Sequence, residues 1–343
     1  MTTASLTPGR NRGLTFVRDY GIVVALAVLV VVIAVAQPGF VAPGNLMNIL
    51  SQWAPVGIMG IGMTYVVITG GFDLSVGAIY SLCAVVAAAL GRTEAPIVAF
   101  AVAVVVGFVV GCVNGFVVTG LRVNPFIATL GMSLVISGVT LVLTGNVAFV
   151  VDFEPFTVLG SGRFLGIPFS GMLLIALMVV AGLVLAYTPY GQSIYAVGGN
   201  AEASRLAGIR IALVTASSYA LSGLCAGIAG IVTASQLSSA QPNLNSNLVF
   251  DVLTVVIVGG TSLAGGRGAI WRTAVGVAIL ATLQNGFNLL DIDAYYQNII
   301  KGLIIIAALA TVDWRRVASR FGRRTASART TPSVTTPTTS PKE

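Results

Sequence analysis

Residues 95–120 read APIVAFAVAVVVGFVVGCVNGFVVTG, a stretch without a charged side chain. The hydrocarbon core of a bilayer is about 30 Å thick, and roughly 20 apolar residues in an α-helix are enough to cross it. This stretch therefore predicts a membrane-spanning helix. The rest of the chain has the same character, because 56% of its 343 residues are apolar and only 8% are charged. A soluble domain carries roughly 25% charged residues, so we expect lipid to be the solvent of this fold.

Ten stretches of the chain are candidate membrane spans. They are residues 20–36, 46–70, 74–91, 95–120, 125–144, 170–187, 211–234, 247–264, 269–289 and 295–313. The sequence thus predicts an all-α, polytopic membrane protein with about ten transmembrane helices. The first span has an alternative interpretation, because Ala34-Val35-Ala36 is similar to a signal-peptidase site. The apolar run from Tyr20 to Ala36 is longer than a usual signal core, which favours its retention as the first helix.

Lysine and arginine are unevenly distributed between alternate connections of these spans. With a cytoplasmic N-terminus, the outer loops hold only Arg92 and Arg163, and the inner segments hold Arg10, Arg12, Arg18, Arg122, Arg205, Arg210, Arg267, Arg272 and the basic residues from Arg315 to Lys342. Cytoplasmic loops are enriched in these residues, so both termini are expected in the cytoplasm. The predicted organisation is an N-terminal segment at 1–19, a membrane domain at 20–313 with a cytoplasmic loop at 188–210, and a cytoplasmic tail at 314–343.

The tail changes character along its length. Its first part is a basic cluster suited to the head groups of anionic membrane lipids, with Arg315, Arg316, Arg320, Arg323 and Arg324. From about Thr325 onward it is rich in Ser, Thr and Pro, which is too polar to build a core and predicts disorder.

Several classes of protein are excluded by what the sequence lacks. There is no histidine, and Cys83, Cys112 and Cys225 lie singly in apolar runs, which argues against a metal site or a disulfide framework. No hydrolase or zinc-protease motif is present, so we do not expect an enzyme or a bound cofactor. The formal net charge of +7 lies mostly beside apolar runs, which argues against nucleic acid as a partner.

Two glycine-rich segments are similar to each other. VVITGG at residues 66–71, followed by Leu74 and Gly77, matches VVIVGG at residues 255–260, followed by Leu263 and Gly266, at one constant offset. Each predicts a helix end and a turn, involving Gly70, Gly71, Asp73, Leu74, Ser75, Gly259, Gly260, Gly265, Gly266 and Arg267. The match indicates either an internal duplication or the chance recurrence of glycine at helix ends. Asp73 is expected at the cytoplasmic edge as a cap of the third helix, with a substrate or coupling role as the alternative.

The cytoplasmic loop predicts a short helix at the membrane face. Asn200 is a suitable N-cap, residues 201–207 are helix formers, and Gly208 is a suitable stop. Glu202 and Arg205 would be exposed. The pattern indicates a docking surface, with an ordinary surface loop as the alternative, and its residues are Gly199, Asn200, Glu202, Ala203, Ser204, Arg205 and Gly208.

The order of the motifs along the chain adds a family resemblance. The segments are GMTYVVITGGFDLSVGAI at 62–79, NPFIATLGMSLVISGVTLVLTG at 124–145, YGQSIYAVGGNAEASRLAGI at 190–209 and VVIVGGTSLAGGRGAI at 255–270, with Tyr296-Gln297 and Lys301-Gly302 near the end. They resemble the ribose/xylose/galactose-type sugar permeases of ABC importers over roughly residues 45–313. Glu202-Ala203-Ser204 and Gly208 are similar to the E-A-A-x-x-x-G loop that seats such permeases on their ATPase. Ser204 departs from the usual alanine, and residues 145–168 match nothing in that family.

The resemblance implies a permease subunit in the cell membrane, with three protein partners. These are an ABC ATPase subunit, an extracytoplasmic sugar-binding protein and a second permease copy, most simply in a homodimer. The chain has no P-loop of its own, so ATP and magnesium would be bound by the ATPase. Polar residues within the spans could line the path of a sugar, with helix–helix hydrogen bonds as the alternative; they are Asn114, Thr129, Asp251, Gln284, Asn285 and Asn288.

Two other functions stay open at this point. One is an ABC permease for a different small solute, such as a branched-chain amino acid, a nucleoside or a polyol. The other is an ion-coupled secondary sugar transporter, which would need ionisable groups inside the membrane. Asp251 is the main candidate for such a group, although it could also lie near the outer interface.

Overall fold

The computed structural model describes residues 12–242, 247–304 and 306–307, with side chains from residue 20 onward. Residues 12–298 belong to one compact unit, and the few described residues after 298 belong to a second unit and are helical. Each is considered by itself. The predictions for residues 1–11 and for the tail at 314–343 lie outside the described residues.

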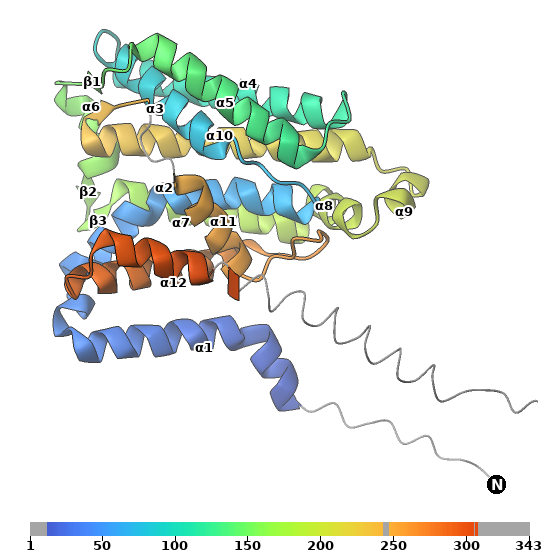
Figure 1. Cartoon of the computed structure of the whole chain (residues 1–343), viewed down its shortest axis with the longest axis horizontal. Coiled ribbons are helices and arrows are strands. Elements are labelled where there is room, and N and C mark those ends of the chain that lie inside the picture. Colours follow the sequence, from blue (N-terminus) through green and yellow to red (C-terminus); the bar gives the residue numbers. More distant parts are fainter. Residues whose placement is uncertain (1–11, 243–246, 305, 308–343) are drawn as a thin grey trace, which may run out of the picture. The chain divides into compact units, whose positions relative to one another are not determined.

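The first unit is built almost entirely from helices (Figure 1). The longer ones are α1 (Arg12–Ala36), α2 (Pro43–Ile68), α3 (Val76–Gly91), α4 (Pro96–Thr119), α5 (Pro125–Thr144), α7 (Phe169–Tyr187), α8 (Pro189–Gly199), α10 (Ile211–Leu237), α11 (Leu248–Val258) and α12 (Ile270–Leu289). The shorter elements are η1 (Pro38–Val41), β1 (Phe149–Val150), α6 (Glu154–Ser161), β2 (Arg163–Phe164), β3 (Ile167–Pro168), α9 (Ala201–Leu206) and β4 (Ser239–Ala240). The predicted all-α class is therefore confirmed.

Proline marks the start of many of these helices. It is the first residue of α2, α4, α5 and α8, where its missing N–H would have had no partner within the helix. The side chain of Asn124 caps α5 by accepting a hydrogen bond from the backbone N–H of Phe126 at 3.0 Å. Gly145, with φ of 58°, ends the same helix in the left-handed region.

The core lies where α10 crosses α2, α3 and α4. Glycine permits this close packing, because a Cβ on Gly107 would lie 2.5 Å from the backbone oxygen of Gly223 on α10. Gly111 and Gly115 of α4 face Tyr219 and Ala216 in the same way. Small residues let membrane helices approach at backbone distance, and at this crossing that accounts for the abundance of glycine.

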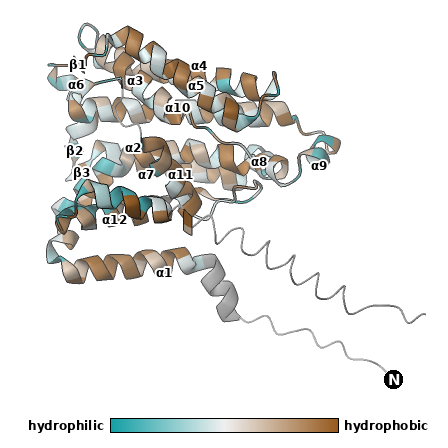
Figure 2. Ribbon diagram, viewed as in Figure 1, coloured by the Kyte–Doolittle hydropathy of each residue, from teal (hydrophilic) through white to brown (hydrophobic). Residues whose placement is uncertain are grey.

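The structure supports several membrane crossings. Among the described residues, five helices are long and apolar enough to cross a membrane, namely α2, α4, α5, α7 and α10. Only 22% of the most apolar window of α4, α5 and α7 is buried within the protein, so their outward faces are apolar, as Figure 2 shows for α4 and α5. Three further apolar helices are shorter, at Tyr20–Ala36, Val76–Gly91 and Leu248–Val258. The protein is polytopic, and the number of ten crossings stays a prediction.

One predicted span differs from the structure, and one loop without a predicted structure contains elements of its own. The span predicted at 247–264 is helical only over α11, because the chain turns at Gly259 and Gly260, the second of which has φ of +85°. Eleven residues of helix rise about 16 Å, roughly half the hydrocarbon core. The loop at 145–168 contains α6 and three short strands, and β1 pairs with β4 across 90 residues of sequence.

The first apolar stretch is integrated with the other helices. α1 packs against α12, where Ile33 is only 6% exposed and meets Gly286. The rings of Tyr20 and Trp271 lie 6.5 Å apart at the other end of α1. This packing favours a retained first helix over a cleaved signal peptide.

The two ends of the helices carry different connections. α8 and α9 lie at one end, together with the turn that follows α11, and β1, α6 and the β2–β3 hairpin lie at the other (Figure 1). The functional candidates therefore separate into a group around α9 and a group inside the helices.

Candidate functional site

The short helix α9 matches the prediction for the cytoplasmic loop closely. The side chain of Asn200 caps it by accepting a hydrogen bond from the backbone N–H of Ala203 at 3.0 Å. Gly208, with φ of +82°, ends it, and the N–H of Ile209 returns to the carbonyl of Ser204 at 3.0 Å. The predicted cap and stop are confirmed. A capped helix of this kind holds a fixed shape although it has few neighbours.

The outward surface of α9 is apolar at its tip and carries an internally paired charge. The Arg205 Nη2 atom lies 2.5 Å from Glu202 Oε1, and the side chains of Arg205 and Glu202 are 66% and 67% exposed. Leu206 is 79% exposed, while Ser204 is buried on the inner side. Burying one exposed leucine side chain against another protein would contribute about 2 kcal/mol.

Behind α9, three glycine-rich segments that are distant in sequence meet. The N–H of Gly266 donates a hydrogen bond to the carbonyl of Ile68 at the end of α2, at 2.8 Å. Gly198, near the end of α8, packs so closely that an added Cβ would overlap the same carbonyl oxygen. Gly265 likewise approaches Gly198 and Gly70. The two glycine motifs noted in the sequence are thus brought together by α8.

The similarity between the two motifs holds with a shifted register. The left-handed glycine that ends α2 is Gly70, and the one that ends α11 is Gly260, an offset of 190 residues. The N–H of Gly71 bonds Val66 and the N–H of Thr261 bonds Val256, again at 190. The sequence match places the offset one residue lower, so the helix ends are equivalent in geometry but not in the register that the letters indicate.

Asp73 is buried deep among the helices, which corrects its predicted place at the cytoplasmic edge. After Gly71 the chain does not begin a helix at once; it turns back into the protein, and α3 starts only at Val76. The carboxylate of Asp73 is 0% exposed and accepts a hydrogen bond from Ser222 at 2.7 Å. Ser222 lies eleven residues into α10, about 16 Å along that helix from its start.

The contacts of Asp73 also refine the expected cap. Its Oδ1 accepts from the backbone N–H of Ser75 at 3.0 Å and from the hydroxyl of Ser75 at 2.6 Å. Ser75, and not Asp73, is the N-cap residue of α3. The carboxylate therefore orients the residue that starts the helix and ties this start to α10.

The six residues proposed for a translocation path fall into separate places. Asn114 donates to the hydroxyl of Ser75 at 2.7 Å, and Thr129 accepts from the N–H of Leu74 at 3.0 Å, so both surround the Asp73 turn. Asn285 exchanges two hydrogen bonds of 2.9 Å with Asn45. The structure does not bring these two groups together.

The remaining three candidates lie on two helices that pack together, α11 and α12. Asn288 accepts from Gln297 at 3.0 Å, and Gln284 is half-buried on the same helix, α12. Asp251 is half-buried in the first turn of α11, where the helix dipole favours a negative charge. Their role in a path stays a prediction.

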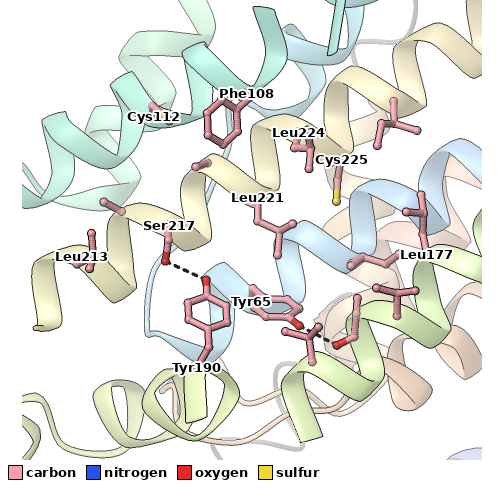
Figure 3. Close-up of a pocket in the computed structure, with 17 residues that line it drawn as sticks. Tyr65, Phe108, Cys112, Leu177, Tyr190, Leu213, Ser217, Leu221, Leu224 and Cys225 are labelled. Carbon is pink, nitrogen blue, oxygen red and sulfur yellow. Dashed lines mark hydrogen bonds between the residues drawn. The ribbon is translucent and has the colours of Figure 1, made fainter. Parts of the chain in front are cut away.

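One cavity among the described residues is lined mainly by apolar side chains. It measures about 640 Å³ and lies between α2, α4, α7, α8 and α10 (Figure 3). Its hydroxyl groups are already engaged, since Tyr65 donates to the carbonyl of Ala181 at 2.7 Å and Tyr190 pairs with Ser217 at 2.9 Å. None of the six path candidates lines this cavity or two others, of about 500 and 320 Å³.

Such a cavity is a poor site for a polar solute. Each sugar hydroxyl that lost water without gaining a partner would cost roughly 1–3 kcal/mol. One copy of the chain therefore presents an exposed, capped helix at α9, and this cavity lacks the polar groups that a sugar site requires.

Comparison with known proteins identifies the family. Residues 45–309 match the model described as the permease component of the branched-chain amino acid transport system. The chain belongs to this permease family. Its members are components of transport systems, so the chain is an integral membrane protein, as the expected resemblance implied.

Several curated permeases are similar to the chain along most of its length. The ribose import permease RbsC of Bacillus subtilis (strain 168) is 42% identical over 83% of this chain and 89% of that protein. The ribose import permease RbsC of Escherichia coli (strain K12) is 40% identical, covering 90% and 98%. The L-arabinose transport permease AraH of Escherichia coli (strain K12) is 34% identical, covering 88% and 92%. No solved structure matches the chain.

Some residues of this permease that form the close backbone contacts behind α9 were not singled out from the sequence. Ile68 contributes a backbone carbonyl, and Gly198 contributes the absence of a side chain, so neither shows a chemical signature. The paired glycines at 198–199 and 265–266 were a signal that could have been compared. Their contact, however, depends on how α8 folds back over the end of α2.

Proposed function

We propose that this permease is the membrane subunit of an ATP-driven ABC importer, and that its cargo is a monosaccharide such as ribose, xylose or galactose. The relatives supply the cargo, because RbsC is named for ribose and AraH for L-arabinose, and both names denote five-carbon sugars. The single observation that carries the mechanism is the exposed, capped helix α9 at one end of the helices.

In this proposal α9 is the seat of a cytoplasmic ATPase subunit. A motor can act on the permease only through a surface that keeps its shape, and the Asn200 cap and Gly208 stop provide this. Leu206 would enter an apolar cleft of the ATPase, with Glu202 and Arg205 at the rim. ATP and magnesium are held by the ATPase, and the permease performs no chemical step.

The sugar path would be completed by a second copy of the chain. The described cavities of one copy are apolar, so the polar surface that a sugar requires is proposed to form between two copies. An extracytoplasmic binding protein would deliver the sugar and provide most of the specificity. Ten transmembrane helices with both termini in the cytoplasm complete this arrangement, which places α9 on the ATPase side.

The test is uptake by the reconstituted transporter. The permease, its ATPase and its binding protein are assembled in proteoliposomes, and entry of radiolabelled ribose, xylose, galactose, leucine and adenosine is measured. We expect uptake of at least one of the sugars that requires ATP and persists after ionophores collapse the proton and sodium gradients. Uptake that needs an ion gradient and not ATP would contradict the proposal.

The description of the family favours a second candidate cargo. Because the family model is named for branched-chain amino acids, leucine uptake without sugar uptake would assign the chain to that group of permeases. The mechanism through α9 would then stand, and only the cargo would change.

A further inference from the structure

Close backbone contacts join the end of α8, next to α9, to the membrane helices. We use the name glycine junction for the cluster of Gly198, Ile68, Gly265, Gly266 and Gly268, in which Gly198 meets Ile68, Gly265 and Gly266, and Gly268 meets Ile68. Gly198 belongs to the last turn of α8, Ile68 is the last residue of α2, and the other glycines lie in the turn between α11 and α12. Three parts of the membrane domain thus meet directly behind the proposed ATPase seat.

The packing at the glycine junction leaves no room for a side chain. An added Cβ on Gly198 would overlap the carbonyl oxygen of Ile68 and would lie 2.6 Å from the N of Gly266. A Cβ on Gly266 would lie 2.7 Å from the Cα of Gly199, and Gly266 has φ of +71°. Backbone therefore rests on backbone, where no side-chain rotamer can change to absorb a displacement.

Two hydrogen bonds close the junction. The N–H of Gly266 donates to the carbonyl of Ile68 at 2.8 Å, and the hydroxyl of Tyr195 on α8 donates to the carbonyl of Gly268 at 2.8 Å. Burial raises the pKa of the Tyr195 hydroxyl, although nearby Arg272 opposes this. Tyrosine donates this bond only while protonated, so the bond is maintained throughout the physiological pH range.

The neighbouring glycine provides an internal comparison. Gly199 follows Gly198 directly, but an added Cβ on Gly199 would meet nothing within 4 Å, and its φ does not require glycine. Two adjacent residues of the same type therefore differ in the space available for a side chain: an added Cβ on Gly198 overlaps the end of α2, and one on Gly199 meets no neighbour.

We propose that the glycine junction is the positioning element that transmits movement of α9 to the ends of α2 and α12. The inference rests on the proposed function, in which α9 is moved by an ATPase. A displacement of α8 and α9 must carry the end of α2 with it, because the contact is rigid. The end of α2 leads directly into the turn that holds Asp73. The carboxylate of Asp73 accepts hydrogen bonds from Ser75, at the start of α3, and from Ser222 on α10, so it ties the start of α3 to α10.

The experiment compares Gly198→Ala with Gly138→Ala in the complete transporter in proteoliposomes; Gly138 lies on α5, outside the proposed ATPase seat, and an added Cβ there would meet nothing within 4 Å. ATP hydrolysis and ribose uptake (or uptake of whichever cargo the wild type carries) are measured together, with the amount of assembled complex determined for each variant. We expect Gly138→Ala to behave like the wild type, because its added Cβ meets no neighbour. For Gly198→Ala we expect the solute transported per ATP to fall by roughly tenfold, within the usual range of coupling free energies, while ATP hydrolysis by the assembled complex continues.

Tyr195→Phe serves as the second variant if Gly198→Ala does not fold. It removes one hydroxyl and leaves the packing intact, so we expect the transport per ATP to fall by roughly twofold to tenfold, the usual worth of one hydrogen bond. A merely structural role would lower the amount of complex and leave the transport per ATP unchanged. That result, or unchanged coupling in both variants, would overturn the inference. A wild-type complex whose uptake does not depend on ATP would instead overturn the proposed function.

Discussion

Asp73 is held inside the helices by groups that carry no charge. Its carboxylate accepts hydrogen bonds from the backbone N–H and the hydroxyl of Ser75 and from the hydroxyl of Ser222. Asn114 supports the same arrangement through Ser75. Buried donors that lose their acceptor cost roughly 1–3 kcal/mol each, so the side chain at position 73 matters for the stability of this turn.

Replacement of Asp73 separates its shape from its charge. We expect Asp73→Ala to lower the stability by roughly 2–4 kcal/mol, because Ser75 and Ser222 lose their acceptor. Asp73→Asn keeps an oxygen towards Ser75 and is expected to retain most of the stability. Thermal unfolding of the purified variants in detergent measures both. Equal loss in the two variants would contradict this expectation and show that the negative charge itself, and not only an acceptor oxygen, stabilises the turn.

Among the individual elements, α9 is a short helix with an exposed outward surface. Leu206→Asp should weaken binding of the ATPase roughly tenfold to a hundredfold, since burial of a leucine contributes about 1.5–3 kcal/mol. The chain itself should unfold at an unchanged temperature, because Leu206 is 79% exposed. Binding is measured by co-purification and by titration of the ATPase onto the permease in nanodiscs.

Leu121→Asp is the matched control for this change. Leu121 is 60% exposed and lies in the short connection between α4 and α5, outside α9. Equal effects at both positions would contradict a specific seat on α9. A companion variant carries Glu202→Arg together with Arg205→Glu. It keeps an ion pair within α9 but reverses the positions of the two charges that the ATPase would contact. Unchanged assembly and coupled hydrolysis in that variant would contradict the docking role.

These elements also indicate how far sequence reasoning reaches. The cap, length and stop of α9 follow from Asn200 and Gly208, because capping is local chemistry. The depth of Asp73 did not follow, since it depends on where α3 begins after the turn and on which serine of α10 lies opposite. The glycine junction was equally hidden, because contacts between backbones leave no pattern in side chains. The length of α11 was overestimated because hydropathy continues past the glycines that end it.

For the whole molecule, the central question is which end faces the cytoplasm. Leu206 on α9 and Leu165 in the β2–β3 hairpin are 79% and 87% exposed and lie at opposite ends of the first unit (Figure 1). In a background without Cys83, Cys112 and Cys225, we expect Leu165→Cys to react with an impermeant maleimide in intact spheroplasts. Leu206→Cys should react only after permeabilisation, as the positive-inside distribution implies.

The reverse labelling pattern would invert the topology and remove α9 from the reach of any cytoplasmic ATPase. Labelling of both positions from outside would show that residues 165 and 206 lie on the same side of the membrane. The number of crossings between them would then be even, not odd. In either case the proposed mechanism through α9 would fail, while the membership of the family would stand.

α10 reaches from one end of the first unit to the other without a break. It begins at Ile211, shortly after α9, and ends at Leu237, just before β4 pairs with β1. Its 27 residues make a rod about 40 Å long. If the proposed ATPase binds α9 and the proposed binding protein binds near the β1–β4 ladder, the two partners act on opposite ends of this one helix, and a tilt of α10 would link them.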